Sequence, residues 1–101
     1  MKVPQFDALI HAPGRLQICA ILSRVDEAEF ATVRDLIAVS DSVMSKHLRQ
    51  LEEADYVALR KAAEAGRQRT WIRLTPSGYE AFAAHVQELT RLAALTPLRA
   101  G

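Results

Sequence analysis

The feature that most constrains the fold is the stretch from residue 39 to residue 57, VSDSVMSKHLRQLEEADYV, because its apolar side chains recur with the period of a helix. On a helical wheel centred on Leu48, Met44 and Leu51 share the inward face and His47 lies at its edge. The opposite face carries Ser42, Val43, Lys46, Arg49 and Gln50. The stretch therefore predicts an amphipathic helix that packs one face on a core and exposes the other.

The outward side chains of this helix have the chemistry of a nucleic-acid contact. Hydroxyls, cations and an amide suit phosphate oxygens and base edges, and a helix fits the major groove of DNA. Surface cations are usually only solvated, but these share one face of the second helix of a predicted helix-turn-helix. We expect Arg49 to contact guanine, Lys46 to contact guanine or a phosphate, and Val43 to contact a thymine methyl group. Asp41 either caps the helix or accepts a hydrogen bond from cytosine.

The rest of the chain predicts the elements of a winged helix-turn-helix. Thr32 and Ser40 are the expected N-caps of the third and fourth helices, and Phe30 is expected in a short strand. Residues 62–68 are the expected hairpin tip. The predicted class is mainly α with a small β-hairpin wing, and consists of a three-helix core plus a terminal dimerisation helix. In chain order we expect helices near residues 6–11, 13–24, 32–39 and 40–54, strands near 57–61 and 69–74, and a final helix from Pro76 that ends before Pro97.

Length and charge bound the domain organisation. A chain of 101 residues, half of them hydrophobic and a quarter charged, is expected to form one domain over residues 1–101. The net charge is only +1, but residues 57–75 hold five cations against the single anion Glu64, which is the pattern of a phosphate contact. We assign terminal helices to 1–25 and 76–96, a helix-turn-helix to 32–54 and a wing to 57–75.

Several classes of protein are not expected. No stretch reaches the roughly 18 apolar residues of a membrane span, and the N-terminus lacks the apolar core of a secretory signal, so we expect no membrane partner and a cytoplasmic protein. The single cysteine, Cys19, can form no intrachain disulfide and is expected in the core. His11, His47 and His85 are far apart in sequence, and there is no nucleophile motif or Gly-rich phosphate loop. We therefore expect no metal site, no cofactor, no catalytic residue and no enzyme activity.

Two segments resemble a known group of proteins. The run SVMSKHLRQLEEADYV resembles the recognition-helix segment of the MarR and ArsR families of bacterial transcription regulators, and GRQRTWIRLTPSGYEAF resembles the MarR-type wing and the following helix. The nearest likeness is to small winged-helix DNA-binding domains. It implies a homodimeric repressor or activator that binds double-stranded DNA at a palindromic operator. By position, the resemblance implies that six residues face the groove: Ser42, Val43, Ser45, Lys46, Arg49 and Gln50. It also implies that three residues form the wing tip: Arg67, Gln68 and Arg69.

Two positions depart from the pattern of these families. Asp55 stands where Gly usually follows the recognition helix, at a site that favours a left-handed backbone. Ala38 replaces a common Gly in the turn of the helix-turn-helix. Because residues other than Gly adopt the left-handed conformation at a cost, we expect these departures to affect local stability more than function.

The wing is the second predicted DNA contact, formed by Lys61, Arg67, Gln68 and Arg69. An arginine near the tip either enters a narrow minor groove or binds the adjacent phosphate, and the alternative is a solvated hairpin tip. Arg73 lies deeper in the strand, and it is expected to pair with an acid instead of contacting DNA. Trp71 is expected in the core or as an anchor on the strand face. Arg15, early in the first long helix, is expected to pair with a carboxylate of the fold rather than to touch DNA.

The terminal helices carry more apolar surface than a short winged helix needs. We expect a homodimer seam, although the same residues can simply cover the back of the domain: Leu9, Ile10, Leu16, Phe82, Val86, Leu89 and Leu92. A twofold dimer would present its recognition helices about 34 Å apart, one turn of DNA. No dedicated ligand residues are visible, but a cleft between the dimer helices and the DNA-binding core is a candidate site for a small apolar effector. The alternative function is that of a winged-helix protein-interaction module without DNA binding.

Overall fold

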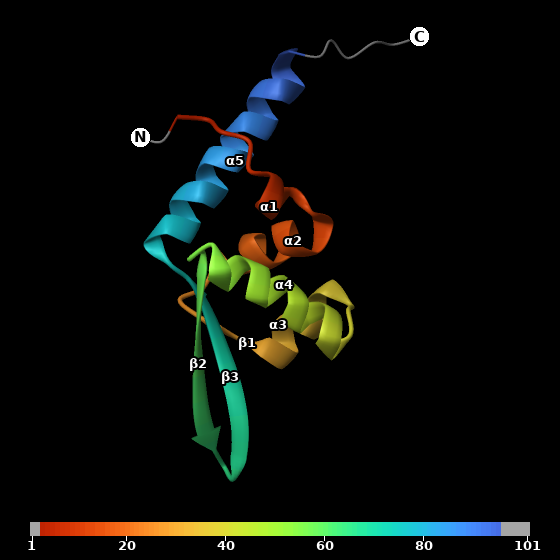
Figure 1. Ribbon diagram of the computed structural model, residues 1–101, viewed down its shortest axis with the longest axis vertical. Helices are drawn as coiled ribbons and strands as arrows, with labels where there is room; N and C mark the ends of the chain where they lie inside the picture. The colour runs from red at the N-terminus through yellow and green to blue at the C-terminus, as the bar shows by residue number, and fades with distance from the viewer. Residues whose placement is uncertain (1–2, 96–101) are drawn as a thin grey trace.

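The computed structural model describes residues 3–95 (Figure 1). The hairpin β2–β3 projects from one end of the helical body and α5 projects from the other. The predicted class, a mainly α winged helix with a small hairpin wing, is confirmed, and α3 and α4 are its helix-turn-helix. Across residues 3–95 no helix combines the length and hydropathy that crossing a bilayer requires. The elements are α1 (Ala8–His11), α2 (Pro13–Leu22), β1 (Ala28–Glu29), α3 (Phe30–Ile37), α4 (Asp41–Glu53), β2 (Val57–Glu64), β3 (Arg67–Leu74) and α5 (Pro76–Leu95).

The core lies between α2, α3, α4 and the base of the hairpin. The inward face predicted for α4 is confirmed, because Met44, Leu48 and Leu51 are all buried. Burial of each such side chain contributes about 1.5–3 kcal/mol, so this face fixes the rotation of α4 about its axis. The polar side of α4 must then point away from the core. The other elements contribute Ile18, Cys19, Leu22, Val33, Val57 and Ile72 to the same cluster.

The turn between α3 and α4 is short, and backbone N–H groups at both of its ends find hydrogen-bond acceptors within a few residues. The turn begins at Ala38, whose φ of 58° is left-handed and whose N–H donates to the Asp35 carbonyl at 3.2 Å. Ser40 caps α4 as predicted, since its hydroxyl accepts from the Val43 N–H at 3.2 Å. Ala38 thus occupies a backbone conformation that Gly would adopt without steric cost.

The start of α3 differs from the expectation. The short strand is Ala28–Glu29, and Phe30 is the first residue of α3 rather than part of the strand. Glu29 pairs with Trp71 of β3, so strand pairing holds the chain extended up to this point and the helix begins directly after it. Thr32 consequently lies inside the first turn, and its expected role as N-cap is wrong.

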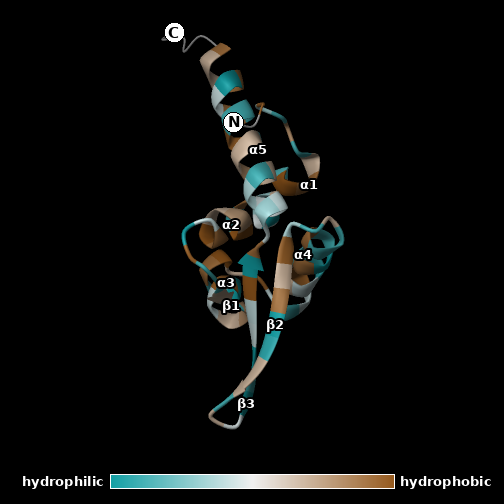
Figure 2. Ribbon diagram, turned by 90° about the vertical axis from the view of Figure 1, so that its left-hand side faces the viewer, coloured by the Kyte–Doolittle hydropathy of each residue, from teal (hydrophilic) through white to brown (hydrophobic). Residues whose placement is uncertain are grey.

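Strands β1, β3 and β2 form a three-stranded antiparallel sheet in that order. The hairpin register runs from Val57 opposite Leu74 to Glu64 opposite Arg67. The turn is therefore only Ala65 and Gly66, whose φ values of 51° and 76° fit a type I′ hairpin turn. The expected tip at 62–68 was too wide, because cross-strand pairing keeps the weak strand formers at 62 and 63 in β2. Brown, hydrophobic segments of both strands lie near the body of the molecule, whereas further out β3 is mostly hydrophilic and β2 has both teal and tan segments (Figure 2).

The base of the wing and the start of α5 share one hydrogen-bonded junction. Thr75 and Pro76 begin α5 in the predicted way: the Thr75 hydroxyl accepts from the Gly78 N–H at 2.9 Å and donates to the Asp55 carbonyl at 2.6 Å. The Thr75 N–H donates to the Tyr56 carbonyl at 3.0 Å. Asp55 has the left-handed φ of 64° that its position predicted. The predicted end of this helix, at residue 96 before Pro97, lies outside the described residues.

The N-terminal segment lies along α5 (Figure 1). The Gln5 N–H donates to the Ala84 carbonyl at 3.0 Å. Asp7 caps α1 by accepting from the Ile10 N–H at 3.0 Å, and its second carboxylate oxygen accepts from the Tyr56 hydroxyl at 2.6 Å. Ile10 is fully buried, so its expected place at a dimer seam is wrong: the packing of its own chain already covers it.

Candidate nucleic-acid interface

The outward face of α4 is open to solvent. Lys46 and Arg49 are exposed, and within residues 3–95 neither makes a hydrogen bond or an ion pair. Val43 is 42% exposed although it is apolar. Ser42 and Ser45 are exposed beside it near the start of the helix. The structure therefore brings together five of the six residues expected to face a groove, and their contact with DNA stays a prediction.

The sixth residue, Gln50, is engaged within the chain. Arg15 Nη1 donates to Gln50 Oε1 at 2.6 Å, Arg15 Nε donates to the Leu9 carbonyl at 2.6 Å, and Arg15 Nη1 lies 3.3 Å from His47 Nδ1. The expectation that Arg15 pairs with a carboxylate is wrong, because its partners are a carbonyl, an amide and an imidazole. Gln50 is half-buried, so it lies at the edge of the outward face rather than at its centre.

His47 takes the place at the edge of the core that its wheel position predicted. Its pKa is lowered from the usual 6.5, first by burial and then by the positive charges of Arg15 and Lys46. The ring packs against Gly14, where an added Cβ would lie 2.4 Å from His47 Nε2. The start of α2 is thereby seated against the middle of α4.

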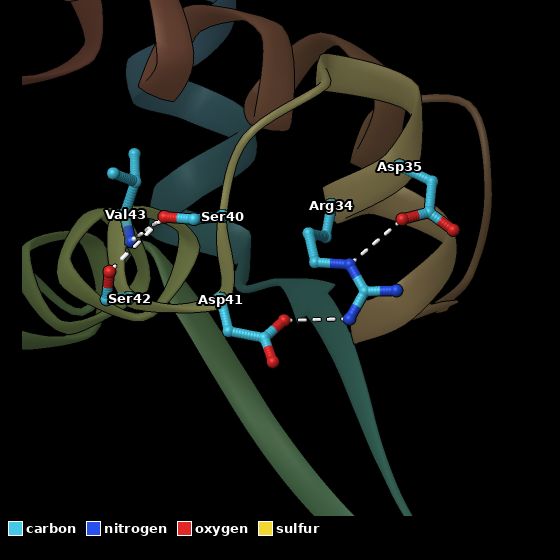
Figure 3. Close-up of polar contacts among 6 residues, drawn as sticks. All are labelled: Arg34, Asp35, Ser40, Asp41, Ser42 and Val43. Atoms are coloured by element: carbon cyan, nitrogen blue, oxygen red, sulfur yellow. Dashed lines mark hydrogen bonds and ion pairs between the residues drawn. The ribbon is translucent and has the colours of Figure 1, made fainter.

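An ion-pair network at the start of α4 was missed by sequence reasoning. Arg34 Nη1 donates to Asp41 Oδ1 at 2.7 Å, and Arg34 Nε donates to Asp35 Oδ1 at 2.9 Å (Figure 3). The two carboxylates raise the pKa of Arg34 further above its usual value. Arg34 offsets the charge of Asp41, which would otherwise repel a phosphate near this end of α4. The sequence did contain a signal for this ion pair, because Arg34 precedes Asp41 by seven residues across a predicted short turn.

Three of the four predicted wing contacts are exposed. Lys61, Arg67 and Gln68 lie on the outer half of the hairpin and face solvent. Arg69 does not, because its Nη1 donates to both carboxylate oxygens of Glu29 at 3.0 Å and the side chain is 30% exposed. Arg69 thus forms an ion pair that joins the hairpin to β1, and its expected contact with DNA stays a prediction.

The solvent face of the sheet is organised around Trp71, which confirms its expected role as a strand-face anchor. Trp71 Nε1 donates to Glu64 Oε1 at 3.1 Å, and the guanidinium of Arg60 lies 5.7 Å from the ring centroid. Arg60 also donates to Glu27 at 2.6 Å. Arg73 is exposed, and no acid pairs with it in the described part of the chain.

The remaining candidate groups are structural. Cys19 is fully buried, and burial raises the pKa of its thiol to about 12, which leaves the reactive thiolate form scarce. The structure brings together two histidines that are distant in sequence: His11 Nδ1 and His85 Nε2 are 3.1 Å apart, and the Asp7 N–H donates to His85 Nδ1 at 2.9 Å. Among residues 3–95 no three His, Cys, Asp or Glu side chains are arranged to hold a metal ion.

Apart from the fully buried Ile10, the apolar residues expected at a dimer seam fall into two groups. Val86 and Leu92 on α5 are each 40% exposed. The others are partly covered by their own chain, and Leu16 and Phe82 pack against the core: Leu9, Leu16, Phe82 and Leu89. Exposed apolar surface on α5 extends to Leu95, which is 65% exposed.

Comparison with known proteins agrees with this geometry. A family model described as a winged helix DNA-binding domain matches residues 15–93. An uncharacterized protein of Methanocaldococcus jannaschii is 31% identical over 78 residues, which are 77% of this chain and 85% of that one.

Solved structures of regulators share the fold. A transcriptional regulator homologue from Pyrococcus horikoshii OT3 superposes with a TM-score of 0.83 at 24% identity, over 89% of both chains. MarR superposes with a TM-score of 0.74 at 18% identity, over 86% of this chain and 63% of that one. The resemblance to MarR-type winged helices is thus confirmed for the fold. With the match over residues 15–93, the chain belongs to the winged helix DNA-binding domain family.

Proposed function

We propose that this chain is a transcriptional regulator that binds double-stranded DNA sequence-specifically as a homodimer. The observation that carries the proposal is the open face of α4. Lys46 and Arg49 stand there without a partner among the described residues, on a helix whose opposite face is fixed in the core. Membership in a family of DNA-binding domains supports the same function.

In this proposal α4 enters the major groove and selects the sequence. Arg49 donates two hydrogen bonds to guanine, and Val43 near the start of the helix contacts a thymine methyl group. Ser42 and Ser45 donate to phosphates or base edges. Lys46, which lies between the serines and Arg49 along the helix, contacts guanine or a phosphate. The ion pair with Arg34 keeps Asp41 from opposing these contacts.

The wing supplies the flanking contact. Lys61, Arg67 and Gln68 are exposed on the outer half of a hairpin that extends well beyond the helical body (Figure 1). A cation at such a tip binds the backbone or enters a narrow minor groove. Phosphate contacts of this kind provide affinity that falls with salt.

The dimer would form through the terminal helices of a single winged-helix domain. One domain of this size makes few contacts for tight specific binding, and the exposed apolar side chains of α5 offer a surface for a second copy. The seam proposed here keeps Val86, Leu89 and Leu92 and omits Ile10. Val86→Glu is expected to shift the protein from dimer to monomer in sedimentation equilibrium, and an unchanged mass would contradict the seam.

A small-molecule effector is a further part of the proposal. A cavity of about 240 Å³ lies between the N-terminal segment and α5. Its lining combines the polar residues Asp7, Tyr56 and Glu80 with Ala81 and Ala84, so it is less apolar than the effector site that the sequence led us to expect. This volume is below the roughly 300 Å³ of common ligand pockets, which limits the size of any such effector.

The decisive experiment begins with selection of bound fragments from random DNA, followed by titrations on matched and mismatched duplexes. Arg49→Ala should relax specificity at one base pair, with a loss of about 1–3 kcal/mol on the matched duplex. Arg67→Ala should weaken binding to all duplexes alike. Equal losses for both variants on every duplex would reject the assignment of roles. Failure of the wild-type protein to bind any duplex at low salt would instead favour a protein-interaction module.

A further inference from the structure

Arg15 has a different set of partners from the other contact-forming arginines of the described chain. Each of those pairs with a carboxylate at 3.0 Å or less: Arg34, Arg60, Arg69 and Arg91. Arg15 is held by three neutral acceptors, and no carboxylate lies within ion-pair distance of it among residues 3–95. Its charge is therefore not compensated inside the fold, although the side chain is half-buried.

The contacts of Arg15 fix its guanidinium beside the outward face of α4. The Leu9 carbonyl and Gln50 Oε1 each accept from it at 2.6 Å, and His47 Nδ1 lies 3.3 Å from Nη1. Gln50 and His47 belong to α4 and flank Arg49 along the helix. Arg15 thus adds a third cation at the edge of the face that already carries Lys46 and Arg49.

The neighbours of Arg15 make this edge a cluster of donors. Because Gln50 Oε1 faces the guanidinium, the amide NH₂ of Gln50 is directed away from it and remains available to donate. The second terminal nitrogen of Arg15, Nη2, also makes no hydrogen bond within residues 3–95. The acceptors of the cluster are occupied by Arg15 itself. Two donors and an uncompensated positive charge fit an anionic oxygen.

We infer that Arg15 and Gln50 together bind a phosphate of the DNA backbone at the edge of the groove that α4 enters. The inference rests on the proposed function and adds to it a contact from α2, outside the helix-turn-helix and the wing. Gln50 is the tenth residue of α4, and base edges are reached mainly from the first turns of a recognition helix. Gln50 therefore positions the protein on the backbone instead of reading a base.

The test is the salt dependence of binding to a duplex of random sequence, measured together with thermal unfolding. Arg15→Met should weaken binding about tenfold on every sequence and lower the slope of log K against log salt by about 0.9 per subunit. Arg15→Lys retains the charge and should keep most of the slope. Arg91→Met is the matched control, because Arg91 is paired with Glu88 on α5, and it should leave the slope unchanged.

A second variant keeps the inference testable if Arg15→Met does not fold. Gln50→Glu supplies Arg15 with a carboxylate at the position of the present amide oxygen, so the unfolding temperature should not fall. The salt slope should fall, because the carboxylate compensates the charge of Arg15. Lys46→Ala is the positive control and should lower the salt slope. If it does so while the slope of Arg15→Met is unchanged, the inference is overturned. If Arg15→Met does not fold, an unchanged slope of Gln50→Glu has the same meaning. If the wild-type protein binds no duplex, the proposed function itself fails and the phosphate contact with it.

Discussion

The recognition helix and the wing carry the same kind of side chain in different electrostatic settings. On α4, Lys46 and Arg49 are exposed and make no ion pair within the described chain. On the sheet, Arg60 is paired with Glu27 and Arg69 with Glu29, and both acids come from the segment before α3. Of the five wing cations, this leaves Lys61, Arg67 and Arg73 uncompensated.

The difference shows that the charge of a sequence segment is not the charge of a surface. Residues 57–75 are the most basic stretch of the chain, yet much of their charge serves to attach the hairpin to β1. The helix α4 has two exposed cations against the three that remain uncompensated on the hairpin, but both lie on the face proposed to enter the major groove, where base and backbone contacts combine. We therefore assign the larger share of DNA affinity to α4 and a smaller share to the wing.

The largest expected effect tests this ranking directly. Lys46→Ala combined with Arg49→Ala should lower DNA affinity about 100-fold, because one base contact and one backbone contact are lost together. Stability should change by less than about 0.5 kcal/mol, since both side chains are exposed. The comparison variant, Lys61→Ala combined with Arg67→Ala, should cost less affinity in the same binding titration. A greater loss in the wing variant would reverse the ranking.

The next effect should come from Glu29→Gln, which removes the carboxylate that holds Arg69. The pair is partly buried, so we expect the free energy of unfolding to fall by about 1–2 kcal/mol in denaturant titration. Arg69 would then be available to DNA, and the salt dependence of binding should become steeper. Glu88→Gln on α5 is the control, with a smaller expected loss of stability because the pair is exposed to solvent, and no change in salt dependence. An unchanged slope for Glu29→Gln would show that Arg69 contributes nothing to DNA binding even when it is released.

Protonation of histidines near neutral pH should affect the helical side of the molecule and not the wing, because residues 57–75 contain no histidine. The pKa of His47 is lowered by burial and by Arg15 and Lys46, and that of His85 by burial and by His11. In both cases the folded pKa lies below the usual 6.5, so the unfolded chain binds protons first as the pH falls. Stability should be full above pH 6.5 and should decrease as the pH falls through the folded values.

The pH profile of the unfolding temperature measures this effect. His85→Gln and His47→Gln should each flatten the decrease below pH 6.5, because each removes one group that binds protons preferentially in the unfolded chain. A profile that rises toward acid in the wild-type protein would contradict the assigned direction of both shifts.

The smallest effects should come from two of the left-handed residues, Ala38 and Asp55, which lie one at each end of α4. Ala38→Gly in the turn before α4 should raise the free energy of unfolding by about 1 kcal/mol, because the steric cost of φ 58° disappears. Asp55→Gly, at the base of the wing, should raise it by about half as much, since Asp tolerates this conformation better than Ala. Thermal unfolding of the two single variants checks the order, and a destabilised Ala38→Gly would exclude strain at that turn.

How far the sequence predicts this molecule depends on how local each determinant is. The inward face of α4, the Ser40 cap, the Thr75–Pro76 start of α5 and the left-handed Asp55 follow from residues within a few positions of one another. The pairing of Arg15 with Gln50, of Arg69 with Glu29 and of His11 with His85 joins residues 35, 40 and 74 positions apart. Periodicity and capping carry no information on such pairs, because the pairs depend on how the elements dock.

The contact between Gly14 and His47 has a consequence for how this chain can vary. A side chain at position 14 would meet the imidazole at 2.4 Å, and the imidazole is itself held in place by Arg15. A larger residue at position 14 therefore requires the imidazole to move away from its place beside Arg15. Relatives that replace Gly14 should therefore carry a smaller residue at position 47, so that the two sites covary as a pair.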